Sequence, residues 1–168
     1  MTAVRPLVRQ PLETPSAVDA LLAHARALRT ANRPRDAEAT LTDAITIAPE
    51  HPDAYRARIL LQLQEGRDMD AFATCASMLA CGGHRHAATL AFAADILLYL
   101  HLRHATLLTR QAAPARADLR SIGVGEPNAV VLAPEFLKRA RTLALAAARR
   151  TPGSAAVQTT LAECELRA

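Results

Sequence analysis

The sequence predicts an all-α fold, in which antiparallel helix pairs form a solenoid with a C-terminal helical cap. The first reason is composition: 51% of the 168 residues are hydrophobic but only 3% are aromatic. Ala and Leu must therefore fill the interior, and both favour helices, whereas strands favour β-branched and aromatic residues. The second reason is a repeat of similar residues every 34 positions. The third is the placement of proline and glycine at the expected ends of helices.

The repeat extends over three successive copies. Ala37 aligns with Ala71 and then with Ala105, and Asn32 aligns with Gly66. Glycine adopts a left-handed backbone conformation without strain, so we expect Gly66 to form the tight turn between two helices. A small residue such as Ala37 is expected where two helices approach closely, because a larger side chain would overpack the contact.

Over about residues 17–113 the pattern resembles the tetratricopeptide repeat family. The residues that match are Leu21, Ala25, Leu28, Ala37, Leu41, Ala44 and Pro49 in the first copy, and Tyr55, Ile59, Gly66, Ala71, Cys75 and Met78 in the second. The resemblance implies helix pairs whose first helices line a concave groove. His24 and Arg58 depart from the family's usual leucine, Gly83 replaces a terminal proline, and Leu100 replaces the turn glycine of the third copy. We therefore expect the second and third copies to pack irregularly.

The chain divides into four predicted parts. Residues 1–15 are expected to be a disordered N-terminal segment, and residues 16–113 to form the three repeats. Residues 114–132 contain Pro, Gly and Asn and are expected to form a loop. Residues 133–168 are expected to form a C-terminal helical pair, at about Pro134 to Arg150 and Ser154 to Arg167.

The stretch AATLAFAADILLYL, residues 87–100, contains a single charged residue, Asp95. A helix that is apolar on all sides is normally buried on more than one side. The predicted cover is the C-terminal helices, a partner or a second copy of the chain.

Motifs for catalysis are missing from the sequence, so we expect that the protein is not an enzyme. It has no nucleophile elbow, phosphate loop or metalloprotease motif. Cys75, Cys81, His84 and His86 offer soft ligands for zinc. However, Cys75 occupies a core position of its helix and Cys81 lies near the helix end, so the two thiols should point in different directions. We therefore predict core and surface residues there, with no metal and no cofactor.

The net charge is +4 and the pI is about 9.5, but the basic residues are spread along the chain. This distribution does not predict a nucleic-acid partner. The N-terminus lacks the apolar core of a signal peptide and no stretch is long enough to cross a membrane, so we expect a cytoplasmic protein. The excess of arginine and alanine is typical of a GC-rich bacterial genome.

The resemblance to the repeat family implies a binding surface on the first helices. Its predicted partner-binding residues are Leu22, Arg26, Arg29, Arg56, Leu60, Leu63, Leu90, Ala94 and Leu97. This set gives one basic end and one apolar end, which suits a protein or peptide with acidic and apolar parts. The family's clamp for chaperone tails uses lysine and asparagine where this chain has Leu22, Arg26 and Ala57, so such tails are not expected ligands. Alternative occupants are the chain's own N-terminus and a second copy in a homodimer.

The function predicted from the sequence is that of a non-catalytic adaptor that binds a partner in this groove. Its size also suits a bacterial secretion or assembly chaperone. The alternative is a regulatory or scaffolding domain associated with an enzyme or with a larger repeat protein.

Overall fold

The computed structural model describes residues 16–111 and 128–167, with side chains for 16–105 and 134–167. Every regular element in these ranges is helical, which confirms the predicted all-α class. The elements are α1 (Ala17–Thr30), α2 (Pro34–Ile47), α3 (Pro52–Gln64), α4 (Asp68–Ala80), the 3-10 turn η1 (Gly83–Arg85), α5 (Ala87–Gln111), α6 (Asn128–Arg150) and α7 (Ala155–Arg167). The segment 1–15, predicted to be disordered, lies outside the described residues.

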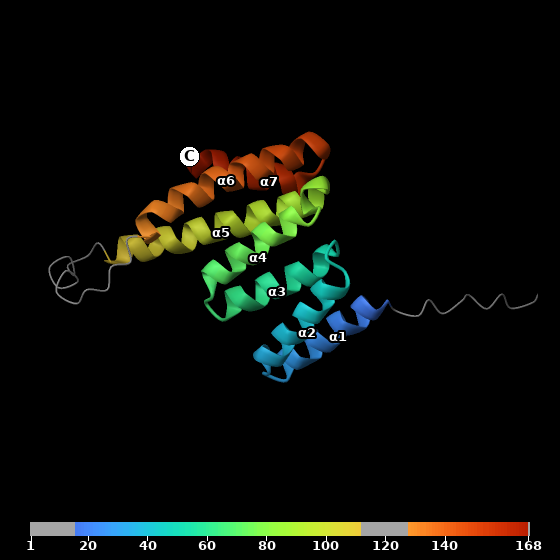
Figure 1. Ribbon diagram of the computed structural model, residues 1–168. Helices are drawn as coiled ribbons and strands as arrows, with labels where there is room; N and C mark the ends of the chain where they lie inside the picture. Colours follow the sequence, from blue (N-terminus) through green and yellow to red (C-terminus); the bar gives the residue numbers. More distant parts are fainter. Residues whose placement is uncertain (1–15, 112–127, 168) are drawn as a thin grey trace, which may run out of the picture.

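Successive helices pack as neighbours along the chain. The helices pair as α1 with α2, α3 with α4 and α5 with α6, and α7 packs against α6 and α5. Figure 1 shows the pairs following one another from α1 to α6, with α7 beside α6 at the end of the stack.

The first two pairs reverse direction through equivalent turns. Asn32 and Gly66 have positive φ angles of 57° and 75°. Just after them, the Arg33 nitrogen donates to the Leu28 carbonyl at 2.9 Å, and the Arg67 nitrogen donates to the Gln62 carbonyl at 2.8 Å. In both turns the residue with the positive φ angle ends the first helix. The next residue then donates its hydrogen bond back to a carbonyl in the last turn of that helix. The 34-residue spacing from Asn32 to Gly66 therefore marks one turn geometry used twice.

The predicted third repeat is different, because the two helices expected there form a single continuous helix. The next position in the series is Leu100, which lies inside the unbroken 25-residue helix α5. A left-handed conformation costs a residue with a Cβ about 1–2 kcal/mol. Leu100 is also fully buried in the core, so continuing the helix through this position buries an apolar side chain as well. The prediction of three helix pairs within 16–113 is therefore wrong for the third.

Helix α6 begins earlier than the sequence predicts. Its first residue, Asn128, lies inside the segment 114–132 that was predicted to be a loop, and Pro134 lies inside the helix instead of at its start. Residues 114–127 of that segment lie outside the described residues. The final helix, α7, agrees closely with the predicted Ser154 to Arg167.

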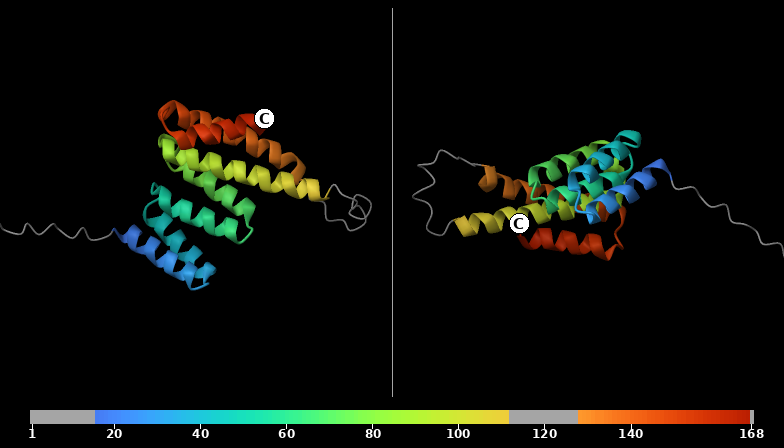
Figure 2. Two further views of the ribbon diagram at one scale, coloured as in Figure 1. Left: turned by 180° about the vertical axis from the view of Figure 1, so that it is seen from behind. Right: turned by 90° about the horizontal axis from the view of Figure 1, so that it is seen from below.

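The apolar helix α5 is covered by the C-terminal helices, as one of the predicted alternatives requires. Its buried side chains form clusters with Phe136 and Ala140 of α6 and with Val157 and Cys164 of α7. The right-hand view in Figure 2 shows α4 and α7 on opposite sides of α5. Among the described helices none is both long and apolar enough to span a bilayer.

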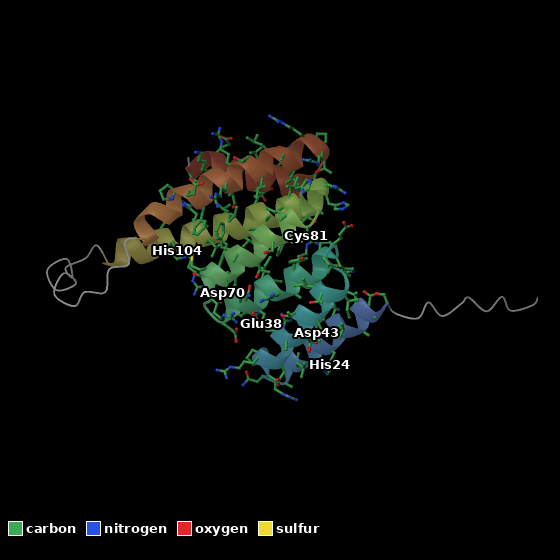
Figure 3. All side chains as sticks on the ribbon, in the orientation of Figure 1. His24, Glu38, Asp43, Asp70, Cys81 and His104 are labelled. Carbon is green, nitrogen blue, oxygen red and sulfur yellow. The ribbon has the colours of Figure 1, made fainter. Side chains whose placement is uncertain are left out.

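A charged cluster links the first helix pair to the second. Glu38 of α2 (Figure 3) accepts hydrogen bonds from Arg67 at 2.5 Å, Gln62 at 3.0 Å and Arg58 at 3.4 Å. The bond from Arg67 is the main reason that the pKa of Glu38 lies below its usual value. Arg58, where the sequence comparison led us to expect leucine, places its guanidinium at this carboxylate.

The turn at Gly66 gives a direct test of the backbone argument. We expect Gly66→Ala to lower the free energy of unfolding by about 1–2 kcal/mol, because alanine is strained at this φ angle. The measurement is urea denaturation followed by circular dichroism. Gly153→Ala is the matched control, since a Cβ there meets no atom within 4 Å and its φ angle is not positive. Equal stability of the two variants would contradict the argument.

Candidate functional site

The structure places four of the nine predicted partner-binding residues in the core. Leu22 is buried in the cluster formed by α1, α2 and α3, and Leu90, Ala94 and Leu97 are buried on α5. Their prediction as groove-lining residues is wrong. Leu22 is covered by α2 and α3, whereas Leu90, Ala94 and Leu97 are buried because the continuous α5 receives α6 and α7 along faces that were expected to be open.

The other five predicted residues keep contact with solvent. Arg26, Arg29 and Leu60 are exposed, while Arg56 and Leu63 are partly exposed. Of these, Arg29, Leu60 and Leu63 come together in one hollow of about 450 Å³. The hollow is completed by Gln64 of α3 and by Asp95, Ile96 and Tyr99 of α5.

The floor of this hollow is apolar and accessible. Leu60 is 42% exposed and Tyr99 is 45% exposed. The Tyr99 hydroxyl accepts a hydrogen bond from Arg103 at 3.2 Å, and the same guanidinium nitrogen lies 3.4 Å from the Leu63 carbonyl as a donor. Arg103 therefore holds the Tyr99 ring next to α3. Large apolar side chains that gather at a hollow are typical of an interaction surface.

A second hollow of about 390 Å³ continues along α5 toward α7. It is lined by Arg56 of α3, by Ala87, Ala88, Ala91, Phe92 and Asp95 of α5, by Thr151 and Ser154 of the turn between α6 and α7, and by Ala156 and Val157 of α7. Asp95 lines both hollows. We name the two hollows together the α5 groove, with α1 and α3 on one side and α7 on the other.

Arg56 is less available than the sequence predicts. Its guanidinium carbon lies 5.3 Å from the centre of the Phe92 ring, and Nη1 lies 3.1 Å from Asp53. Its Nε is buried without a hydrogen-bond partner among the described residues. The contact with Phe92 is a cation–π interaction, so Arg56 contributes more to the groove wall than to a free basic site.

Charges of opposite sign stand at the two sides of the groove. Arg26 and Arg29 project from α1, and Arg29 lines the first hollow. On the far side, Asp95 is exposed and its Oδ1 accepts a hydrogen bond from the Thr160 hydroxyl of α7 at 2.5 Å. The surrounding protein removes part of its hydration and raises its pKa, and nearby Glu163 adds to this shift. The side predicted to be apolar therefore carries a carboxylate.

Several groove residues were missed by the prediction of partner-binding residues. Phe92, Asp95, Ile96 and Tyr99 recur at three- and four-residue spacing, so they share one face of α5. The signal available in the sequence was Asp95 itself, the lone charge in residues 87–100. What the sequence did not supply was the position of α7, which brings Thr160 to Asp95.

The cysteines and histidines that suggested zinc lie in different surroundings. Cys75 is buried, which raises its pKa to about 12, whereas Cys81 is partly exposed at the end of α4. His84 points its Nδ1 at the Leu79 carbonyl, 3.0 Å away. Figure 3 shows His104 at the other end of the α4–α5 pair from Cys81. Within the described residues no three His, Cys, Asp or Glu side chains gather at a distance suited to a metal ion.

Comparison with known proteins yields similarity in structure alone. No protein-family model matches the sequence, and no curated protein matches it. A similar solved structure is the 2.19 Å crystal structure of a "putative protein binding protein" from Bacteroides ovatus ATCC 8483. It has a TM-score of 0.54 and 16% sequence identity, and the match covers 95% of this chain and 77% of that one. At this identity the similarity shows a shared fold.

The surroundings of Asp95 predict how stability depends on pH. The pKa of Asp95 is higher in the folded state than in the unfolded state, so folding favours the protonated carboxyl group. This contribution to stability is fully present at a pH below the unfolded-state pKa. It is lost as the pH rises through the folded-state pKa. We therefore expect Asp95→Asn to be slightly more stable than the wild type at pH 7, by less than about 1 kcal/mol for an exposed group.

The measurement is thermal unfolding of both proteins at pH 7 and at pH 3, where the difference should shrink. Asp43→Asn, at an exposed position of α2, removes the same charge without the hydrogen bond to α7. A clear loss of stability in Asp95→Asn at pH 7 would show that the charged form is favoured.

Proposed function

We propose that the protein is a non-catalytic interaction module that binds a segment of a partner protein in the α5 groove. The observation that carries this proposal is the exposure of Leu60 and Tyr99 in one hollow between α3 and α5. Complete burial of a fully exposed apolar side chain contributes about 1.5–3 kcal/mol, and covering the exposed part of Leu60 or Tyr99 contributes a little less than half of that. Two of them, at the centre of a contact, supply the apolar anchor that a specific interface needs.

The arrangement of helices supports the same function. Stacked helix pairs form extended inner surfaces that bind partners in many repeat proteins. The resemblance of residues 17–113 to the tetratricopeptide repeat family remains a prediction, and it agrees with a groove lined by α1, α3 and α5. The similar structure from Bacteroides ovatus carries a protein-binding description, which is in line with this proposal.

The chemistry of the groove favours binding over catalysis. Its ionisable side chains are Arg29, Arg56, Asp95 and Tyr99. Catalysis by covalent or acid–base chemistry needs a base within hydrogen-bonding distance of an accessible nucleophile. The hydroxyl that donates to Asp95 belongs to Thr160, which is buried, and the Tyr99 hydroxyl accepts from Arg103. Neither contact presents an exposed activated nucleophile to the groove.

A second candidate function is that of a scaffolding or regulatory domain joined to an enzyme or to further repeats. It is favoured by Leu166, which is 87% exposed near the end of α7. A further helix or domain that packs on α7 would cover it. Substitution of Leu166 by aspartate separates the two functions, since partner capture by the groove should survive it.

The direct test is capture of the partner from the cells that encode this protein. Full-length chain is used as bait, and bound proteins are identified by mass spectrometry. We expect one protein at fixed stoichiometry, reduced about tenfold or more by Leu60→Asp, because a buried charge replaces an apolar contact.

Met69→Asp is the matched control, since Met69 is 47% exposed on α4 and lines neither hollow of the groove. Equal loss in both variants would point to a general effect on folding or charge. No loss in Leu60→Asp would place the binding surface elsewhere and overturn the proposal.

A further inference from the structure

We infer that the α5 groove binds a peptide in one direction, with an acidic residue toward α1, an apolar side chain in the hollow and a basic residue beside Asp95. This inference rests on the proposed function and specifies the chemistry of the partner. It follows from three features of the groove.

The first feature is that Asp95 has no cationic partner among the described residues. Arg29 and Arg56 line the hollows beside it, but the ion pair that Arg56 makes is with Asp53. The neighbouring charge that acts on Asp95 is another carboxylate, Glu163. Where α5 meets α7 the groove therefore presents a carboxylate that forms no ion pair with a described residue, with a second carboxylate, Glu163, nearby.

The second feature is that Asp95 lines both hollows of the groove, where the surrounding protein already removes part of its hydration. Any segment that covers it removes more hydration, which is costly for a carboxylate unless an opposite charge or a donor replaces the water. An acidic residue placed there would add repulsion from both Asp95 and Glu163. A lysine or arginine of the partner removes the penalty, so this position discriminates between peptides.

The third feature is the exposed pair Arg26 and Arg29 on α1. Both arginines are open to solvent, and neither forms an ion pair with another described residue. Arginine binds carboxylates well through its planar set of donors. Because Arg29 and Asp95 line the same hollow as Leu60 and Tyr99, the acidic and basic residues of the peptide should flank its apolar anchor within a few positions.

The test is selection from a phage-displayed library of random peptides, with the full-length chain as target. Wild-type protein should enrich peptides that contain an apolar or aromatic residue with a basic residue on one side and an acidic residue on the other. The double variant Asp95→Asn, Glu163→Gln should lose the basic preference and keep the apolar one. The variant Arg26→Gln, Arg29→Gln should lose the acidic preference.

The best peptide is then synthesised and its Kd is measured by fluorescence anisotropy. We expect Asp95→Asn to weaken binding about tenfold, the size expected for loss of one charged hydrogen bond. Asp43→Asn, which removes a carboxylate from α2 outside the groove, should leave the Kd unchanged. Equal weakening in both variants would mean that overall charge, and not Asp95, sets the preference, and would overturn the inference.

The outcomes separate the inference from the proposed function. Peptides that depend on Leu60 but show no basic preference would overturn the inference and leave the proposed function intact. A selection without any Leu60-dependent peptide overturns both. A third outcome is that the chain binds peptides only when it carries Leu7→Asp and Leu12→Asp. Since these substitutions weaken apolar contacts of the N-terminal segment, this outcome would assign the groove to that segment and would overturn the assignment to a partner.

Discussion

Within each of the first two helix pairs, the chain turns back through one residue that accepts a left-handed backbone conformation, and this requirement shapes the rest of the molecule. Asn32 and Gly66 meet it and each ends a short helix. Leu100 stands at the next position of the series and does not, so α5 continues for 25 residues. The longer helix gives α6 a correspondingly long partner, and it leaves room for α7 to return beside α5. The alanines Ala93, Ala140 and Ala144 are fully buried, and their small size permits this close packing.

The groove is a consequence of that long helix. Its centre lies on one face of α5, its basic side comes from α1, and its acidic side forms where α7 packs against α5. In a regular array of short pairs, α7 would belong to a later repeat, further along the stack. Here the bond between Asp95 and Thr160 spans 65 residues of sequence. The charges of the groove therefore depend on tertiary packing more than on any local motif.

The sequence predicted the parts of the structure that depend on local spacing. The turn at Gly66 and the small buried residues Ala37 and Ala71 all lie where the 34-residue pattern placed them. The prediction failed where one residue changed the path of the chain. Leu90, Ala94 and Leu97 are groove positions only if α5 is a short first helix, and they become core once α6 and α7 cover it. Asp95 was visible as a lone charge, but its role required the position of α7, which the repeat pattern does not contain.

The placement of Asp95 argues that the groove is more than a gap left by packing. It is the single charged residue in residues 87–100, and its raised pKa shows that the surrounding protein disfavours its charged form. A neutral residue at this position would be easier to accommodate in the free protein. Groups that lower stability and lie on an accessible surface are typical of functional sites, where activity opposes stability. In the binding mode that we propose, Leu60 and Tyr99 supply affinity, whereas Asp95 and Arg29 determine which partner is bound and in which direction.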